Sequence, residues 1–469
     1  MMKKKSAYFV GIKGVGMTAL SIYFKEKGYT VKGSDTEAVF HTDKILSRFH
    51  IPVVRGFDKK NISKNYDLVV VTGAHGGIKN SEAQEAKEKG LKVVMHGQAL
   101  GEEMKKYCGI SISGTHGKTT TSALVASILT HAGCDPSYVV GTSDILDLTA
   151  PGHYGRGKYF IAEADEYITS PGFDSTPRFL WQHPEILVIT NIEYDHPDAY
   201  SDVSEIENAF YKLTQNLKGE KILIGCCDNN SVLKVLKKYK GKILTYGFSK
   251  NAMYQVGSFK FEKGKTTFDI TKSGAKVAQV STYLTGKHNI LNSLAASLVC
   301  RTVGLSWDEI SENILKFKGS RRRFEFIREK GKFRFYDDYA HHPTEIAATV
   351  SGARMFFPDF YITVIFQPHT YSRTKSLFKQ FLTSFDWADK ILIAPIYASA
   401  REEKDTSVSS EMLVAALVKN GKNAYLVNRP TDAVKGIKNN EVKKELIITM
   451  GAGDINTWQD EIYKGVQVT

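Results

Sequence analysis

Cysteine is scarce in this chain, with only five in 469 residues. Their number is odd and no two form a CxxC pair, so neither a disulfide framework nor a redox motif is indicated. We expect buried or idle thiols in a reducing compartment at Cys108, Cys134, Cys226, Cys227 and Cys300.

Long hydrophobic runs are also lacking. Without an apolar stretch of about 18 residues, no transmembrane helix is expected. The basic start MMKKKSAYFVGIKG superficially resembles a signal peptide. Its apolar run of about six residues is too short for one, since Gly11, Lys13 and Gly14 interrupt it. We therefore expect a cytoplasmic protein that does not interact with membranes.

Acidic residues are fewer than basic ones, 50 against 63, which gives a net charge of +13 and a pI near 9.2. The basic residues are spread along the chain and form no stripe interleaved with aromatic residues. This distribution favours small anionic substrates over nucleic acid. The length predicts two or three domains, and 42% hydrophobic residues can form large cores.

Predicted strands alternate with predicted helices throughout, which indicates an α/β protein with parallel sheets. The first unit has a strand at 7–10, glycines at Gly11, Gly14 and Gly16, and a helix from Met17. The next strand ends at Asp35. A glycine turn followed by an acid about 20 residues later is typical of a Rossmann dinucleotide site, although the order here is GxxGxG.

The segment GTHGKTTT, residues 114–121, lies between a short apolar strand and a helical pattern. Strand, glycine turn, lysine, hydroxyl and helix form the layout of a phosphate-binding loop. Lys118 would add positive charge and Thr119 could bind Mg²⁺. Ile112 occupies the position of the first glycine in the usual GxxxxGK[ST] pattern. We interpret the segment as a nucleotide-binding loop.

Two further predicted strands of this unit end in polar residues. One runs from 159 into Glu163, and the other precedes IEYDH, which ends at His196. Ligands of open α/β sheets bind at the carboxyl ends of strands, so these side chains should meet the phosphate loop. A carboxylate and an imidazole beside such a loop suggest ligands of a divalent metal.

A third unit begins after Gly319 with the basic cluster SRRRFEF. Its predicted strands run into DDYAHHPTE, QPHTYSRTK and GAGDI. The cluster adjoins a predicted domain hinge, where mobile cations could stabilise an anionic transition state. We predict three domains: 1–107 and 319–469, both Rossmann-like, and 108–318, a central ATPase-type domain with a mostly parallel sheet.

These motifs occur in the order GTHGKTTT, EADE, TNIEYDH, GKHNILNSLAA, FKGSRRR, DDYAHHPTE and GAGDI. Together they resemble the Mur ligase family, the ATP-dependent amide ligases of peptidoglycan precursor synthesis. The resemblance covers essentially the whole chain. It implies that the first domain binds a UDP sugar, the central domain ATP with Mg²⁺, and the third the incoming amino acid.

The resemblance also implies roles for single residues. Lys118 would contact the transferring phosphate, Thr119 and Glu163 would serve Mg²⁺, and His196 a second metal. The ATP-binding residues would be Gly114, Thr115, His116, Gly117, Lys118, Thr119 and Thr120, with His288, Asn289 and Asn292 on the adenine side. From the third domain, Asp338 and one or both of Arg322 and Arg323 would reach ATP, while His341, His369 and Arg373 would lie near the amino acid. The UDP group would be surrounded by Gly11, Gly14, Gly16 and Asp35.

Within the family, GIKGVGM, HHPTE and QPHxYSRT imply that L-alanine is joined to UDP-N-acetylmuramate. Two features depart from that pattern. The segment between Glu163 and His196 is about eight residues longer than expected and resembles the ligase that recycles the tripeptide L-Ala-γ-D-Glu-meso-diaminopimelate. Thr370 stands where an arginine is usual. The tripeptide therefore remains an alternative substrate.

The implied chemistry begins with attack of the lactyl carboxylate on the γ-phosphate of ATP. This step gives an acyl phosphate, which the amine then attacks. We expect a monomer or weak homodimer. Two other hypotheses are an NAD-dependent Rossmann oxidoreductase, from the first glycine turn and Asp35, and a nucleic-acid-dependent ATPase, from the net charge.

Overall fold

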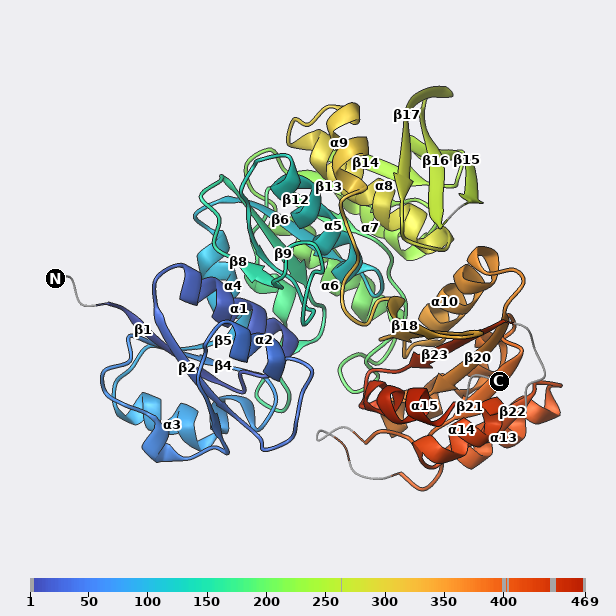
Figure 1. The fold of residues 1–469 in the computed structure, drawn as a ribbon. Coiled ribbons are helices and arrows are strands. Elements are labelled where there is room, and N and C mark those ends of the chain that lie inside the picture. The colour runs from blue at the N-terminus through green and yellow to red at the C-terminus, as the bar shows by residue number, and fades with distance from the viewer. Residues whose placement is uncertain (1–3, 263, 399–401, 403–404, 439–443, 467–469) are drawn as a thin grey trace.

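In a computed structural model, the chain folds into three α/β units arranged around a common centre (Figure 1). The structure describes residues 4–262, 264–398, 402, 405–438 and 444–466. The three units contain a five-stranded, a ten-stranded and a six-stranded sheet, and a separate two-stranded hairpin lies in the central unit. The predicted α/β class with parallel sheets is confirmed.

The first unit is a parallel sheet with the order β3-β2-β1-β4-β5. Alternation along β1 sends Ala7 and Phe9 to a core with α1 and α4, and Tyr8 and Val10 to the opposite face with α3. The elements are β1 Ser6–Val10, α1 Val15–Glu26, β2 Thr30–Asp35, α2 Asp43–Arg48, β3 Val53–Arg55, η1 Lys59–Asn61, β4 Leu68–Val71, η2 Gly77–Lys79, α3 Ser81–Glu88, β5 Val93–Met95 and α4 His96–Met104.

The central unit has the strand order β17-β16-β15-β14-β13-β12-β6-β9-β7-β8. Strands from β15 to β7 run parallel, while β16, β17 and β8 pair antiparallel to their neighbours. Its strands are β6 Cys108–Ser113, β7 Ser137–Val139, β8 Gly152–His153, β9 Tyr159–Ala164, β10 Ile168–Ser170, β11 Asp174–Pro177, β12 Ile186–Ile189, β13 Ile222–Cys226, β14 Lys242–Gly247, β15 Tyr254–Glu262, β16 Lys265–Lys272 and β17 Ala275–Thr282. Its helices are α5 Lys118–His131, η3 Arg178–Trp181, α6 Val203–Gln215, α7 Asn230–Lys238, α8 Lys287–Thr302 and α9 Trp307–Ile314.

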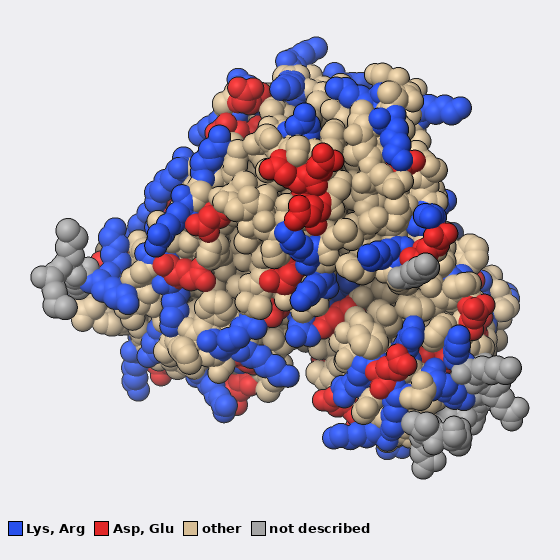
Figure 2. All heavy atoms as spheres, turned by 45° about the horizontal axis from the view of Figure 1, so that its top comes forward, with Lys and Arg blue, Asp and Glu red and all other residues tan. Residues whose placement is uncertain are grey.

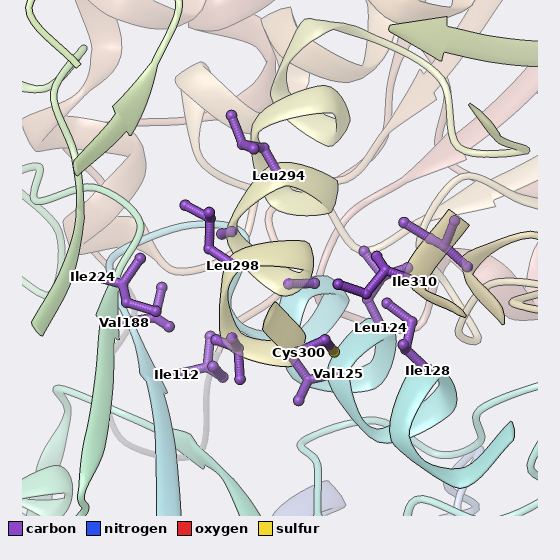
Figure 3. Close-up of a cluster of buried hydrophobic side chains, with 14 of the residues drawn as sticks. Ile112, Leu124, Val125, Ile128, Val188, Ile224, Leu294, Leu298, Cys300 and Ile310 are labelled. Atoms are coloured by element: carbon purple, nitrogen blue, oxygen red, sulfur yellow. The ribbon is translucent and has the colours of Figure 1, made fainter. Parts of the chain in front are cut away.

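The largest core lies between the central sheet and the helices α5, α8 and α9 (Figure 3). Ile112, Val188 and Ile224 point from neighbouring strands toward Leu124 on α5 and Leu298 on α8. Because α5 is packed on several sides, it is buried from Thr119 to Leu129. This core fixes the beginning of α5, and with it the phosphate loop, against the ends of the strands.

The third unit has the order β18-β19-β23-β20-β21-β22, in which only β18 is antiparallel. Helices α10, α12 and α13 pack on one face of this sheet and α14 and α15 on the other. The elements are β18 Glu325–Lys330, β19 Phe333–Asp338, α10 Pro343–Phe356, β20 Tyr361–Phe366, α11 Tyr371–Ser376, α12 Phe378–Ser384, β21 Lys390–Ile393, α13 Ser410–Lys419, β22 Ala424–Leu426, α14 Pro430–Lys438, β23 Glu445–Met450, η4 Ile455–Trp458 and α15 Gln459–Gly465.

The first and central units share an apolar core. Val139, Phe160 and Ala162 of the central sheet belong to the same buried cluster as Tyr23 of α1. The backbone of Gly152 in β8 approaches α1 so closely that a Cβ there would lie 2.0 Å from the carbonyl oxygen of Ala19. The first unit is therefore docked by burial of apolar surface.

All five cysteines are free, and Cys226, Cys227 and Cys300 are buried. Within the described ranges, no helix is both long enough and apolar enough to span a bilayer. Lysine and arginine side chains are distributed over all three units on the face shown in Figure 2, with acidic side chains among them.

Candidate active site

The phosphate loop requires glycine at two positions. Gly114 has φ +134° and Gly117 has φ +81°, conformations that residues with a Cβ rarely adopt. A Cβ on Gly114 would lie 2.0 Å from Oγ1 of Thr190, and one on Gly117 would lie 2.5 Å from Oδ1 of Asn292. Ile112 is a fully buried core residue of β6. The departure from the GxxxxGK[ST] pattern thus falls inside the strand, and the turn itself keeps its glycines.

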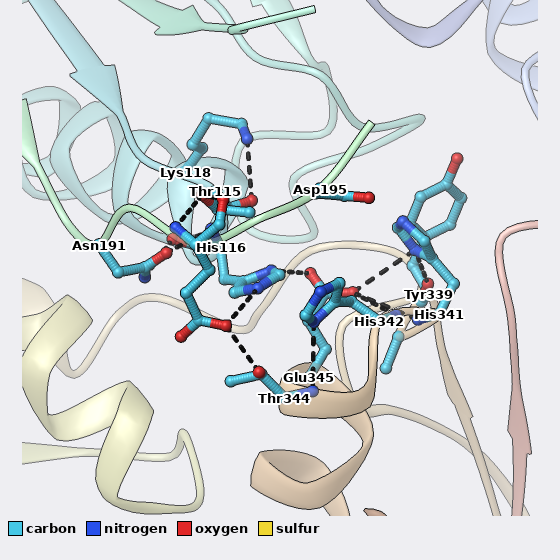
Figure 4. A network of polar contacts seen from close by, with 12 residues as sticks. Thr115, His116, Lys118, Asn191, Asp195, Tyr339, His341, His342, Thr344 and Glu345 are labelled. Carbon is cyan, nitrogen blue, oxygen red and sulfur yellow. Dashed lines mark hydrogen bonds and ion pairs between the residues drawn. The ribbon is translucent and has the colours of Figure 1, made fainter. Parts of the chain in front are cut away.

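Lys118 is held above the loop as a cation (Figure 4). Its Nζ donates to the carbonyl oxygens of Gly114 (2.6 Å) and Thr115 (3.0 Å) and to Oε2 of Glu166 (2.8 Å). Burial lowers the pKa of Lys118, but the carboxylates of Glu166 and Asp165 raise it by more than burial lowers it, so the net shift is upward. The ammonium group stays charged where a nucleotide phosphate would enter.

Thr119, in the first turn of α5, and Glu163, near the end of β9, bring a hydroxyl and a carboxylate together. The Thr119 hydroxyl donates to Oε1 of Glu163 at 3.1 Å, and the amide of Gly141 donates to Oε2 at 2.8 Å. Hydroxyl and carboxylate oxygens are preferred Mg²⁺ ligands, so these side chains fit the predicted metal. His196 lies beside Glu166, the carboxylate that also pairs with Lys118, with its Nε2 3.7 Å from Oε1 of Glu166.

The three strand ends meet because β6 lies between β9 and β12 in parallel register. The structure thus brings Lys118, Glu163 and His196 to one edge of the sheet, where the sequence placed them. His196 has φ +57°, which is unusual for a residue with a side chain. Its ring packs against Tyr167 at a centroid distance of 4.8 Å.

A cavity of about 140 Å³ lies between the phosphate loop, α8 and the third unit. His288, Asn289 and Asn292 line it from α8, and their contact with an adenine stays a prediction. The side-chain amide of Asn292 donates to Asn289, whose own amide donates to the carbonyl oxygen of Thr285. Burial lowers the pKa of His288 to about 4, so its imidazole is neutral at pH 7. Thr120 lines the cavity from α5.

The two hinge arginines have different surroundings. Arg323 reaches the central unit, where its Nη2 donates to Oγ1 of Thr119 at 3.0 Å. Arg322 is buried, and its Nε donates to Asp337 at 3.0 Å while its Nη2 donates to the carbonyl oxygen of Gly451 at 2.6 Å. The prediction left open which arginine approaches ATP; the geometry places Arg323 at the loop and holds Arg322 within the third unit.

Asp338 lines the cavity at the end of β19. Its carboxylate accepts the amides of Phe324 and Ala340, both at 2.7 Å. Burial raises the pKa of Asp338 to about 6. These contacts make Asp338 an organiser of the loops that carry Arg323 and the following histidines.

The three residues predicted to lie near the amino acid form one group. Arg373 donates from Nε to Oδ1 of Asp195 at 2.9 Å, and its Nη1 lies 3.2 Å from Nδ1 of His369. The rings of His369 and His341 are 5.9 Å apart. Burial lowers the pKa of His341 to about 4. Asp195, which precedes His196, joins this group to the edge of the sheet that carries His196.

Thr370 has an identifiable structural role. Its backbone has φ +70°, and its side-chain oxygen accepts the amide of Arg373 at 3.4 Å, capping α11. Its own amide donates to the carbonyl oxygen of Tyr397 at 3.0 Å. Where an arginine was expected, the chain therefore has a residue that fixes the backbone just before Arg373.

In the first unit, the glycine turn joins β1 to α1. Gly11 has φ +79°, and a Cβ there would lie 2.3 Å from Thr72. Gly14 precedes α1, and Gly16 lies against His96. Asp35 is 1% exposed, and its carboxylate accepts the amides of Lys13 (2.7 Å) and Thr36 (2.8 Å). Asp35 thus shapes the turn, and its contact with a UDP group stays a prediction.

The long segment after Glu166 forms the hairpin β10–β11 followed by η3. It packs against the first unit so closely that a Cβ on Gly73 would lie 2.3 Å from the carbonyl oxygen of Thr169, and one on Gly77 2.2 Å from Oγ of Ser170. Arg178 pairs with Asp165 at 2.9 Å. The segment thus connects the loop at residues 73–77 of the first unit to the edge of the sheet that carries Lys118.

Sequence reasoning missed the carboxylates that organise this centre. Glu166, Glu193, Asp195 and Glu345 lie inside the motifs EADE, TNIEYDH and HHPTE, but no role was assigned to them. All four contact cationic or imidazole side chains. The sequence did contain a signal for them. Several acidic residues occur in the same set of motifs that supplies the lysine, arginine and histidine residues of the site.

The fold and site define a three-unit α/β enzyme with a phosphate loop that faces a separate arginine-bearing unit. Three family models match it: "Mur ligase family, catalytic domain" at residues 6–108, "Mur ligase middle domain" at 112–300, and "Mur ligase, glutamate ligase domain" at 322–453. The chain belongs to the Mur ligase family.

Curated relatives match over nearly the full length. A UDP-N-acetylmuramate–L-alanine ligase of Desulfitobacterium hafniense (strain Y51) is 37% identical over 450 residues, covering 96% of this chain and 97% of the relative. The enzyme of the same name from Carboxydothermus hydrogenoformans is 37% identical over 454 residues, with coverages of 97% and 95%. These relatives give no support to the oxidoreductase and nucleic-acid-dependent ATPase hypotheses.

Solved structures share the three-domain architecture. The UDP-N-acetylmuramate-alanine ligase of Thermotoga maritima superposes with a TM-score of 0.82 at 26% identity, covering 98% of this chain and 99% of the other. A murein peptide ligase of Psychrobacter arcticus has a TM-score of 0.71 at 22% identity, with 98% of both chains covered, and supports the fold alone.

Proposed function

We propose that this protein is an ATP-dependent ligase that joins L-alanine to the lactyl carboxylate of UDP-N-acetylmuramate. The observation that carries the proposal is the contact of Arg323 from the third unit with Thr119, which follows Lys118 and contacts Glu163. This arrangement suits the transfer of a phosphoryl group at a site formed by two domains. The names of the curated relatives support the choice of substrates.

In the proposed reaction, the sugar carboxylate attacks the γ-phosphate of ATP, the bond to the β-phosphate oxygen breaks, and an acyl phosphate and ADP are formed. The amine then attacks the acyl carbon, and phosphate leaves. Both steps concentrate negative charge, which preorganised cations stabilise. Lys118 of the central unit and Arg323 of the third unit supply such cations. A Mg²⁺ ion held by Thr119 and Glu163 would neutralise phosphate oxygens, and His196 would serve a second metal.

The group around Arg373 is the proposed amino-acid site. Arg373 supplies the positive charge that a carboxylate needs, and His341 and His369 supply imidazoles beside it. Burial keeps His341 neutral at pH 7, as its lowered pKa of about 4 shows. A neutral imidazole can accept a hydrogen bond from the incoming ammonium group and orient it, while its low pKa makes it too weak a base to remove the proton that the ammonium must lose before it attacks.

We also propose the domain divisions after residues 107 and 318, with the UDP group bound near Gly11, Gly14, Gly16 and Asp35. The β10–β11 hairpin packs against Gly73 and Gly77 of the first unit, and the chain just before it carries Glu166, which pairs with Lys118. A UDP sugar bound in the first unit would thus extend its carboxylate toward Lys118.

The test is an ADP-release assay with UDP-N-acetylmuramate and a panel of L-alanine, glycine, L-serine and the recycling tripeptide. We expect the largest kcat/KM with L-alanine. The tripeptide is the second candidate because the segment that forms β10–β11 resembles that of the recycling ligase. A kcat/KM larger for the tripeptide than for L-alanine would reverse the assignment. Absence of ADP release with every acceptor would contradict the ligase proposal.

A further inference from the structure

The two carboxylate oxygens of Glu345 have different partners. Oε2 accepts the amides of His341 (3.2 Å) and His342 (3.4 Å), completing a capping box at the beginning of α10. Oε1 faces the other way, 3.2 Å from Nδ1 of His116 and 4.0 Å from Nη1 of Arg323. Helix capping accounts for Oε2, and it does not account for the position of Oε1.

His116 extends from the phosphate loop into the gap between the two units (Figure 4). Its backbone is fixed, since its amide donates to Asn191 at 2.8 Å and its carbonyl oxygen accepts the hydroxyl of Thr190 at 2.6 Å. Its Nε2 lies 3.4 Å from Glu193, and Glu345 is on the other side of the ring. The imidazole is thus held between one carboxylate from each unit.

The charge of this ring agrees with its position. Burial lowers the pKa of His116, but Glu345 and Glu193 raise it to about 10, so the ring is an imidazolium at neutral pH. The hydroxyl of Thr344 donates to Glu193 at 2.7 Å, which adds a second contact between the units. Polar contacts therefore join the third unit to the loop, in contrast to the apolar core shared by the first and central units.

A metal site explains the cluster less well. Ligand atoms of His116, Glu193 and His342 lie within 4.8 Å of one another. The Nδ1 of His342, however, accepts the amide of Thr344, and its Nε2 faces the carbonyl oxygen of Tyr194, both at 3.2 Å. Both ring nitrogens of His342 are thus occupied by the backbone.

We propose that Glu345 is a positioning residue that couples closure of the third domain to the phosphate loop. Through Oε1 it binds His116 of the loop and orients Arg323, whose other nitrogen reaches Thr119. Glu345 thereby aligns the arginine with the loop before the nucleotide is bound. The catalytic part of this inference rests on the proposed ligase function, whereas the closure part does not.

The test variant is Glu345→Gln, because glutamine also completes a capping box but lacks the charge. The matched control is Glu309→Gln in the exposed capping box at the start of α9. We expect Glu345→Gln to increase the radius of gyration of the ligand-free protein in small-angle X-ray scattering and to lower kcat at least about tenfold, within the usual range of coupling between sites. Glu309→Gln should change neither quantity.

A double-mutant cycle with His116→Gln identifies the partner. If the two residues act as one unit, the double variant has the same kcat as the slower single variant. Two results would overturn the proposal. One is a double variant whose loss of kcat equals the product of the two single losses. The other is a Glu345→Gln protein with unchanged radius of gyration and kcat. If Glu345→Gln fails to fold, the radius of gyration of the His116→Gln variant tests the proposal instead. We expect it to be larger than that of the unsubstituted protein. If the unsubstituted protein forms no ADP, the ligase proposal fails while the scattering comparison still tests closure.

Discussion

Arg373 and Asp195 are 178 positions apart in the chain, yet Nε of the arginine donates to Oδ1 of the aspartate at 2.9 Å. Both side chains are buried. Burial would raise the pKa of Asp195, but the neighbouring His196 and the Arg373 guanidinium hold that pKa well below its usual range. This pair connects the proposed amino-acid site to the edge of the sheet that carries His196.

Replacing Arg373 with lysine should therefore impair the enzyme. Lysine keeps the charge but lacks the planar guanidinium that contacts Asp195 and His369 together. We expect KM for the amino acid to rise and kcat to fall by about 10²-fold, with KM for UDP-N-acetylmuramate unchanged. Steady-state kinetics with each substrate varied in turn checks this. Unchanged amino-acid kinetics would remove Arg373 from the site.

Lys118→Ala should abolish ADP formation while binding of the UDP sugar survives. Loss of one preorganised charge typically costs about 10²- to 10³-fold in rate. The substitution also leaves the buried carboxylate of Glu166 without its 2.8 Å partner, so Glu166→Gln is added in a companion variant to restore stability. An active Lys118→Ala enzyme would contradict the phosphate-loop assignment.

Arg323 and Arg322 should respond differently to replacement by alanine. Arg323→Ala removes the contact with Thr119 and should lower kcat with little change in melting temperature. Arg322→Ala breaks a buried pair with Asp337 and should lower the free energy of unfolding by about 3–5 kcal/mol. Chemical denaturation and ADP release on both variants separate the two roles. Equal loss of stability in both would show that neither is specific to the reaction.

The hairpin contact predicts an effect of Gly73→Ala. Gly73 does not have a positive φ, so the added methyl acts through its clash with Thr169, 2.3 Å away. We expect a higher KM for UDP-N-acetylmuramate because the clash moves the first unit relative to the phosphate loop of the central unit. Gly257→Ala in β15, whose nearest neighbour would be 3.2 Å away, is the control. Equal KM values for both variants would contradict a role of the hairpin in positioning the sugar.

Closure should depend on pH through His116, which faces Glu193 and Glu345, with His341, His342 and Arg323 nearby. Its folded pKa of about 10 is above the unfolded value near 6.5. Its stabilising contribution is therefore complete below pH 6.5 and is lost as the pH rises toward 10. The pKa of Glu193 is lowered to about 2, because His116 outweighs the burial that would raise it, so the contribution of Glu193 is present above its unfolded pKa near 4.3.

The measurement is the melting temperature of the unsubstituted protein and of His116→Gln from pH 5 to 10. We expect the difference between them to be largest near pH 5–6 and to shrink toward pH 10. A difference that is constant over this range would show that the imidazolium charge does not hold the units together.

Much of the fold was predictable because its causes are local. Short apolar runs identified the strands at Ala7, Ile186 and Glu445, and a glycine follows the first and the third of them. Since carboxyl ends of parallel strands share one edge, the meeting of Lys118, Glu163 and His196 also followed from the sequence.

The tertiary structure alone decided which residues pair across the units. The sequence offered two adjacent hinge arginines with equal claims, and only the backbone, with φ +60° at Arg322, turns one inward and the other toward the loop. The partners of Asp195 and His116 likewise depend on how the third unit docks. Such contacts join side chains more than a hundred positions apart, and no periodicity or turn residue in the chain encodes their distance.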